Sequence, residues 1–216
     1  MNLKYKFWSF RKAIPDRICD AIIRYGRSLP SHKGVVGGLD MGEDPSADKK
    51  DKLLKTRNAE IAWFDELWIC NELFPYIKMA NKNANWNFQW DWTEATQFTM
   101  YKKGYFYTWH KDGWDEPYPT LNQETEYKAN PDRRKGKIRK LSSILALNDA
   151  TEFKGGEVEV DFDTKRHPNE QIVTCEDLKY KGSLIVFPSD VWHRVTPVTE
   201  GKRFSLVSWY LGQPYV

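Results

Sequence analysis

The hydrophobic positions follow a helical period in two segments of the first third of the chain. Apolar side chains in residues 14–26 recur every three or four positions, which predicts an amphipathic helix. Pro15 suits the first turn of that helix, and Gly26 supplies a stop signal. Residues 64–80 repeat the pattern, and we expect Pro75 to kink or split this second helix. Its predicted apolar face consists of Phe64, Leu67, Trp68, Phe74 and Ile77.

The helical period is lost between these segments, over residues 30–58. This stretch holds four glycines and then a run of mixed charge, DKKDKLLK. No Gly-Lys-Ser/Thr follows the glycines, so the stretch lacks the pattern of a phosphate-binding loop. It predicts a mobile surface loop.

From about residue 83 onward the period changes to two. Aromatic and polar residues alternate in 86–92, and the alternation continues in 97–101, which predicts two strands. Further short strands are predicted at 105–109, 140–147, 156–162, 172–176, 182–188, 192–198 and 203–210. Short strands at this spacing, with Gly and Pro turns, indicate an antiparallel sandwich or barrel rather than a parallel α/β sheet.

The order of the elements, helices first and strands afterwards, predicts an α+β, mainly β, fold. The length of 216 residues suits a single domain, residues 1–216. Within it, residues 1–82 would form the helical support with its mobile loop, and residues 83–216 the β core.

A charged insertion over about residues 113–139 interrupts the predicted strands. Its first half is acidic and its second half basic, and Trp114, Tyr118 and Tyr127 give it apolar anchors. Both ends are fixed to neighbouring strands, so we expect a lid that orders on substrate binding and excludes water. The alternative is a disordered insertion with no role. The basic run at 133–140 is more typical of a solvated loop than of a phosphate-binding surface.

Composition narrows the class of protein. Apolar residues make up 40% and aromatic residues 15% of the chain, which excludes disorder for most of it. Mean hydropathy is −0.71 and no stretch of 18 apolar residues occurs, so a transmembrane helix is excluded. The charged N-terminus lacks the apolar core of a secretory signal.

The cysteines and the net charge bear on compartment and partners. Three widely spaced cysteines fit neither a disulfide framework nor a thiolate zinc site, and indicate a reducing, cytoplasmic location. A net charge of +3 is too small to argue for nucleic acid as a partner. The sequence gives no indication of the oligomeric state.

The candidate chemistry lies in three residues, His110, Asp112 and His193. On an extended segment, residues two apart point to the same side, so His110 and Asp112 can bind one ion. With His193, at the start of a later strand, they make the two-histidine, one-carboxylate set typical of non-haem Fe(II). By itself His-x-Asp is weak, because a surface histidine paired with its neighbour would look the same. The other two histidines, His32 and His167, fit solvated loops.

Arg203 strengthens this interpretation. It follows His193 across a predicted turn at 199–202, which would return the chain antiparallel beside the preceding strand. Arg203 and Ser205 would then share the face on which His193 is expected. The alternative is a surface arginine flanked by Lys202. The apolar residues around Arg203 argue against it, because an unpaired buried arginine is costly and requires an anionic partner.

The segments that carry these residues resemble a known family. They are FTMYKKGYFYTWHKDG, LSSILALND with FKGGEVEV, and KGSLIVFPSDVWHRVTPVTEGKRFSLVSWYLG. Over roughly residues 95–212 they are similar to the catalytic core of the 2-oxoglutarate- and Fe(II)-dependent oxygenases of the prolyl-4-hydroxylase type. The resemblance implies a double-stranded β-helix, or jelly roll, supported by N-terminal helices.

The resemblance also implies roles for individual residues. His110, Asp112 and His193 would be the iron ligands, and Arg203 would bind the distal carboxylate of 2-oxoglutarate. Ser205 and Tyr101 would assist Arg203. The turn Gly155, Gly156 and Glu157 matches one that opens a core strand in the family.

The activity implied is hydroxylation of a prolyl residue in a peptide or protein, with 2-oxoglutarate decarboxylated to succinate. Fe(II) and dioxygen would be required, with ascorbate as reductant. Trp109 and Trp114 could line a groove for the peptide. Two alternatives stay open: the same chemistry on a free amino acid or nucleic acid, and a catalytically silent jelly-roll binding module. The complete set of three ligands together with Arg203 argues against the silent module.

Overall fold

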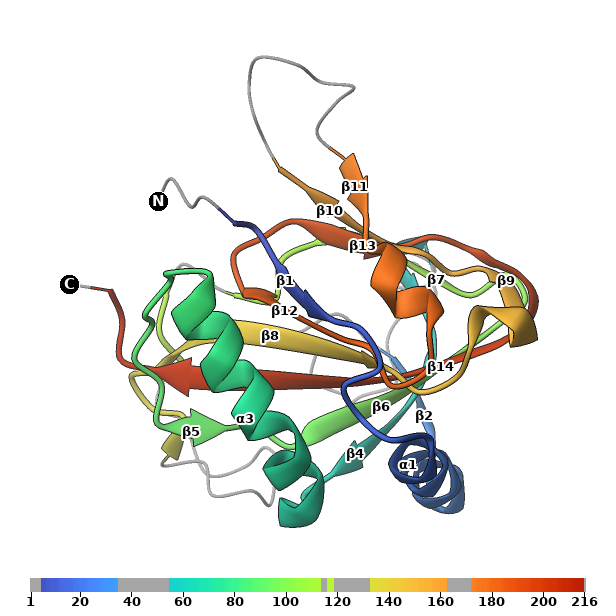
Figure 1. Cartoon of the computed structure of the whole chain (residues 1–216), viewed down its shortest axis with the longest axis horizontal. Helices are drawn as coiled ribbons and strands as arrows, with labels where there is room; N and C mark the ends of the chain where they lie inside the picture. Colours follow the sequence, from blue (N-terminus) through green and yellow to red (C-terminus); the bar gives the residue numbers. More distant parts are fainter. Residues whose placement is uncertain (1–4, 35–54, 114–115, 119–132, 163–171, 216) are drawn as a thin grey trace, which may run out of the picture.

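Two antiparallel β-sheets form the centre of the structure, and two helices lie against the outer side of the larger sheet (Figure 1). The computed structural model describes residues 5–34, 55–113, 116–118, 133–162 and 172–215. The helices are α1 (Asp16–Ser28) and α3 (Leu67–Asn83), with short 3-10 helices η2 (Ala150–Glu152) and η3 (Glu176–Lys179).

The larger sheet has the strand order β1-β12-β8-β14-β6-β4-β2, and β5 and β9 also pair with β14. Its strands are β1 (Trp8–Phe10), β2 (His32–Lys33), β4 (Glu60–Phe64), β5 (Trp92–Thr93), β6 (Thr96–Lys102), β8 (Ile138–Ala146), β9 (Phe153–Gly155), β12 (Leu184–Pro188) and β14 (Val198–Gly212). The smaller sheet has the order β11-β10-β13-β7-β3. Its strands are β3 (Arg57–Asn58), β7 (Phe106–His110), β10 (Val158–Asp161), β11 (Ile172–Thr174) and β13 (His193–Val195).

The chain passes back and forth between the sheets. The strands β6, β8, β12 and β14 belong to the larger sheet, while β7, β10 and β13, which lie between them in sequence, belong to the smaller one. This alternation is how a jelly roll is wound. The predicted mainly β, jelly-roll fold with helical support is therefore confirmed.

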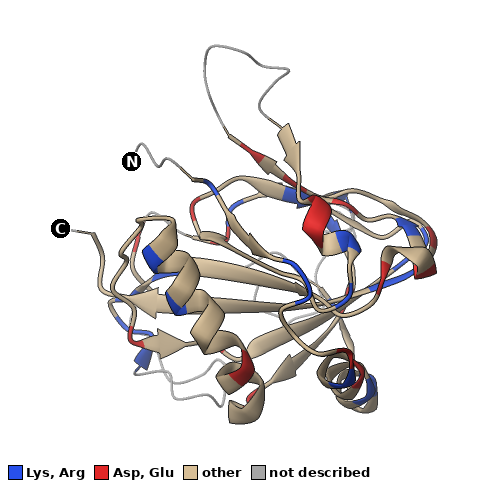
Figure 2. Ribbon diagram, in the orientation of Figure 1, with Lys and Arg blue, Asp and Glu red and all other residues tan. Residues whose placement is uncertain are grey.

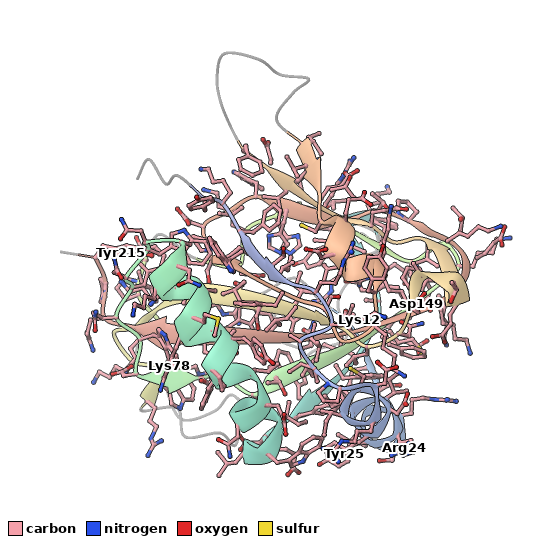
Figure 3. All side chains as sticks on the ribbon, in the orientation of Figure 1. Lys12, Arg24, Tyr25, Lys78, Asp149 and Tyr215 are labelled. Atoms are coloured by element: carbon pink, nitrogen blue, oxygen red, sulfur yellow. The ribbon has the colours of Figure 1, made fainter. Side chains whose placement is uncertain are left out.

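Each face of the larger sheet has its own hydrophobic core. On the outer face, helix residues such as Ile22 and Ile77 pack with Leu145 and Leu206 of the sheet. Side chains fill this space beneath α3 (Figure 3), and the strands there carry few charges (Figure 2). On the inner face, Ile144, Ile185 and Phe187 meet Val160 and Val195 of the smaller sheet. We call this second cluster the inter-sheet core. No helix in the described residues is long and apolar enough to span a membrane.

Helix α1 forms where the pattern predicts it, but Gly26 does not end it. The helix continues to Ser28, and Gly26 is buried. A Cβ atom on Gly26 would lie 2.6–2.8 Å from ring atoms of Phe98. Gly26 is therefore required for close packing of the helix on β6, not as a stop. Tyr25, labelled in Figure 3, ties α1 to the start of α3 by donating to Glu66 Oε1 at 2.6 Å.

The second predicted helix is shifted, and of its predicted face only Ile77 and the partly buried Phe74 pack against the core from the helix. Phe64 belongs to strand β4, whereas Leu67 and Trp68 are exposed. The buried positions of α3 are Ile69, Leu73, Ile77 and Ala80. Pro75 lies inside one continuous helix, so the predicted split does not occur. Pro75 and Asn71 are both exposed, so water can satisfy the Asn71 carbonyl that loses its intrahelical partner.

Most of the predicted strand at 86–92 is absent, and only Trp92 lies in a strand, β5. The alternation of buried and exposed side chains is nevertheless real. Positive φ angles at Asn85 (57°) and Asn87 (54°) break the extended backbone. The Asn81 side chain pairs with the Phe88 main chain in both directions, at 2.9 Å each, in place of a strand partner.

Two further expectations about loops are wrong in part. The 30–58 loop contains β2 and β3, each only two residues long and so too short to show a period. Residues 35–54 of this loop lie outside the described residues. Residues 114–115 and 119–132 of the proposed lid lie outside them as well.

The predicted turn at 199–202 is part of the continuous strand β14, where Gly201 (φ 71°) allows close approach of β9. Consequently β13 and β14 are not neighbours, and lie in different sheets.

The packing at Gly26 gives a stability prediction. Gly26→Ala should destabilise the protein by about 1–3 kcal/mol, because overpacking against Phe98 outweighs the better helix propensity of alanine. Urea unfolding would measure the difference, with Arg24→Ala, an exposed change on the same helix, as the control. Adding Phe98→Leu should make the two losses less than additive, and strict additivity would contradict this account.

Candidate active site

The three residues predicted to bind a metal lie together where β7 and β13 pair. His110 ends β7, His193 begins β13, and the two are directly opposite in the register. Asp112 follows β7 and reaches both: Oδ1 lies 3.8 Å from His110 Nε2, and Oδ2 lies 3.7 Å from His193 Nε2. One ligand atom from each residue lies within 4.8 Å of the others. The arrangement therefore has the size of a metal site.

A β-bulge in β7 directs His110 into this site. His193 is opposite His110 and Val195 is opposite Tyr107, so two residues of β7 face one residue of β13. As a result, Tyr107 and His110, three positions apart, point the same way and stack with ring centroids 3.4 Å apart. The guanidinium of Arg57 covers the Tyr107 ring at 4.6 Å. Strand periodicity could not reveal Tyr107 or Arg57 as neighbours of the site, because the bulge interrupts the period.

Both imidazoles are oriented by main-chain carbonyls. Nδ1 of His110 lies 2.8 Å from the Thr108 carbonyl, and Nδ1 of His193 lies 3.0 Å from the Val191 carbonyl. A carbonyl only accepts, so Nδ1 carries the proton in each ring and Nε2 is left with a free lone pair. Burial, together with the nearby His193, lowers the pKa of His110 to about 3, so this ring is neutral at physiological pH.

The main chain of Asp112 is fixed to the turn between β12 and β13. The Asp112 and Gly113 amides both donate to the Ser189 carbonyl, at 3.0 and 2.7 Å. A Cβ atom on Gly113 would lie 3.2 Å from the Ser189 main chain, so glycine permits this approach. Burial alone would raise the pKa of Asp112, but His193, His110 and Arg139 nearby hold it below its ordinary value. The side chain is therefore an ionised carboxylate.

These three groups fit a divalent cation. Asp112 Oδ2 is buried and has no hydrogen-bond partner among the described residues. The two Nε2 atoms that face the carboxylate carry lone pairs as well, so all three groups offer lone pairs to the same space. Two imidazole nitrogens and one carboxylate oxygen suit Fe(II), with other first-row divalent ions as substitutes.

Arg203 is a buried cation on the inner face of β14. Its side chain is 3% exposed, and Nη1 donates to Ser205 Oγ at 3.2 Å. The guanidinium lies 5.6 Å from the centroid of Tyr101, its partner in the β14–β6 register. Gly156 leaves room for it, because a Cβ atom there would lie 3.0 Å from Arg203 Cδ.

No carboxylate among the described residues forms an ion pair with Arg203. Nη2 is buried without a partner, and burial lowers the pKa of the guanidinium. Arg203 borders the inter-sheet core through its contact with Tyr101. His193 borders the same core through Phe187, and the centroids of the His193 and Phe187 rings are 4.7 Å apart. The geometry thus leaves a cation that requires an anion in the same interior as the three candidate ligands.

Arg139, whose side chain is 15% exposed, was not recognised in the sequence as a neighbour of the site. Arg139 is the second residue of β8 and belongs to the run 133–140 that was expected to be solvated. In the structure Lys140 is buried and Arg139 is largely buried, so this expectation is wrong for both residues. Arg139 pairs with Glu94 through Nη2–Oε2 (2.5 Å) and Nε–Oε1 (3.2 Å). It also donates from Nη1 to the Asp112 carbonyl at 3.3 Å. A local pattern could not reveal this contact between distant segments.

The remaining residues considered in the sequence analysis either lie away from the three candidate ligands or fall outside the described residues. Trp109 packs against Arg194, and His32 is exposed in β2. Trp114 and His167 are outside the described residues.

The chain resembles known proteins in both sequence and fold. A model of the 2OG-Fe(II) oxygenase superfamily matches residues 96–211. A PKHD-type hydroxylase of Hyphomonas neptunium is 38% identical over 84 residues, which cover 37% of this chain and 34% of that protein. A PKHD-type hydroxylase of Xylella fastidiosa (strain M12) is 30% identical over 118 residues, which cover 54% of this chain and 44% of that protein. The chain thus matches less than half the length of these curated relatives.

Among solved structures, the chain is similar to the viral collagen prolyl hydroxylase of Paramecium bursaria Chlorella virus-1, described as a 2OG complex. The TM-score is 0.61 with 18% identity, and 97% of each chain is covered. At this identity the similarity shows that the fold is shared. Since the family model covers more than half of the sequence, the chain belongs to the 2OG-Fe(II) oxygenase superfamily.

Proposed function

We propose that this chain is a 2-oxoglutarate- and Fe(II)-dependent dioxygenase that hydroxylates a prolyl residue of a peptide or protein. The observation that carries the proposal is the group of three buried acceptors, His110, Asp112 and His193, whose ligand atoms lie within 4.8 Å of one another. Arg203, a buried cation bordering the same interior, supports it.

In this proposal the two Nε2 atoms and the Asp112 carboxylate hold Fe(II) on one side. The carbonyls of Thr108 and Val191 keep both rings in the tautomer that leaves Nε2 free. When bound, iron supplies the oxidative decarboxylation of 2-oxoglutarate by dioxygen and the transfer of one oxygen atom to substrate. The protein orients the reactants and excludes water.

Arg203 binds the distal carboxylate of 2-oxoglutarate. Its planar guanidinium matches a carboxylate with two parallel hydrogen bonds, and Nη2 is free to make one of them. Ser205 holds Nη1, and Tyr101 covers one side of the guanidinium. The inter-sheet core around them is apolar, which strengthens a charge-assisted contact.

The prolyl substrate is inferred from the relatives. The PKHD-type hydroxylases share sequence with part of this chain, and the viral neighbour is a collagen prolyl hydroxylase. We further propose that residues 83–216 are the catalytic core, that residues 1–82 support it, and that the 113–139 insertion is a lid. Ascorbate as reductant is a prediction of the family resemblance.

A cytoplasmic location is also part of the proposal. All three cysteines are free, which suits a reducing compartment. Burial raises the pKa of both Cys19 and Cys175 to about 12, so these thiols are unreactive.

A panel of proline-rich peptides tests the function directly. Incubation with Fe(II), 2-oxoglutarate and dioxygen should add the mass of one oxygen atom to a peptide and release succinate in equal amount. Modification of a free amino acid or nucleic acid instead would redirect the substrate class. Tight binding of a peptide without any succinate would favour a silent binding module.

Replacing His193 with alanine tests the metal site. The change removes one of three ligands, so affinity for Fe(II) or Mn(II) should fall by more than about 100-fold. That loss exceeds the effect of changing a residue that contacts only a ligand and not the metal. Metal titration would measure it, with the exposed His32→Ala as control. Stoichiometric metal and full turnover in His193→Ala would show that the ligand set is wrong.

Replacing Arg203 tests the co-substrate site. Arg203→Ala should weaken 2-oxoglutarate binding by about 2–5 kcal/mol, or tens- to thousands-fold. Arg203→Lys should restore only part of it, because an ammonium cannot reproduce the guanidinium fork. Arg11→Ala, at an exposed arginine, is the matched control. Identical 2-oxoglutarate titrations for wild type and Arg203→Ala would assign that carboxylate to another residue.

A further inference from the structure

Asp112 differs from the two histidines in how its metal-facing atom is held. Each imidazole is oriented by a hydrogen bond on the opposite side of its own ring. The Asp112 oxygen nearest His193, Oδ2, has no hydrogen-bond partner among the described residues. Ser142 also hydrogen-bonds the Asp112 carboxyl group. The position of Oδ2 therefore depends on that contact and on how the Asp112 main chain is fixed.

The Asp112 main chain is held from two directions. On one side, the Asp112 and Gly113 amides donate to the Ser189 carbonyl. On the other side, Arg139 Nη1 donates to the Asp112 carbonyl at 3.3 Å. Within the described part of the chain, Arg139 is the one side chain with a hydrogen bond to the Asp112 main chain.

Arg139 is itself held rigidly. Glu94 accepts from both Nε and Nη2, and Tyr118 donates to Glu94 Oε1 at 2.9 Å. The guanidinium lies 4.1 Å from the centroid of the Trp209 ring. The bidentate pair and the aromatic ring together fix the plane of the guanidinium, and so the direction in which Nη1 points.

The fork geometry explains why this position needs arginine. One edge of the guanidinium is occupied by Glu94, which leaves Nη1 for the Asp112 carbonyl. A lysine ammonium is a single point of charge, so a lysine drawn to Glu94 would lose the fixed direction toward Asp112.

We propose that Arg139, held by Glu94, is a positioning residue that sets the Asp112 carboxylate at the distance from His110 and His193 that metal binding requires. The inference rests on the proposed metal site. It assigns a role to an ion pair that otherwise would only bury two charges, which by itself contributes little to stability.

Co(II) binding to the whole chain, measured without 2-oxoglutarate or turnover, tests this role. The variants are Arg139→Lys and the double variant Glu94→Gln with Arg139→Met, which removes both charges and leaves none buried alone. The matched control is Lys137→Met, which breaks an ion pair with Asp91 (2.5 Å) at the residue directly before the same strand. Circular dichroism and thermal unfolding establish that each variant is folded.

Both site variants should raise the Kd for Co(II) by about 10–100-fold and change its ligand-field spectrum, while Lys137→Met should match wild type. A folded Arg139→Lys or double variant with the wild-type Kd and spectrum would overturn the inference. Loss of the fold in both would overturn it too, because Arg139 would then act on overall stability. If wild type binds Co(II) but never makes succinate with iron, the proposed function fails while the positioning role stands.

Discussion

The pairing of β7 with β13 is the interaction on which the candidate site depends. It places His110 opposite His193, although the two lie far apart in sequence. The bulge in β7 then turns His110 and Tyr107 to the same side, and the chain leaving β7 is fixed to the Ser189 carbonyl. A one-residue change of register would send His110 to the outer face of the smaller sheet and separate the three ligands.

The larger sheet supports the smaller sheet, which contains the β7–β13 pair, through the inter-sheet core. β14 is its longest strand and pairs with β5, β6, β8 and β9. Its inner face carries Arg203 and Ser205 at one end and Trp209, beneath Arg139, at the other. Its outer face is covered by the helices. Residues placed on a central strand move little, which suits groups that must meet reactants at fixed distances.

The sequence predicts what depends on local chemistry and misses what depends on long-range contact. His110, Asp112, His193 and Arg203 could be singled out by their residue types, their spacing and the family resemblance. The predicted turn before Arg203 was wrong, because the glycine that indicated a reversal instead allows β9 to approach β14. The helix face of α3 and the strand at 86–92 were misjudged because packing and two positive φ angles override the local pattern. The Arg139–Glu94 pair joins segments that no local period connects.

Arg139 and Arg203 show that an arginine paired within the protein and an arginine left unpaired suit different roles, the first structural and the second in binding. Arg139 has its partners within the protein: a carboxylate, a carbonyl and an aromatic face. Arg203 is more deeply buried, yet in the described part of the chain Nη1 has one hydroxyl, that of Ser205, as its hydrogen-bond partner and Nη2 has none. An uncompensated buried cation costs several kcal/mol, which folding must offset from other contacts. The unpaired Asp112 oxygen carries a cost of the same kind. A dicarboxylate beside Arg203 and a cation beside Asp112 would remove both costs, so the stability of the fold and the binding of its ligands are linked through these two groups.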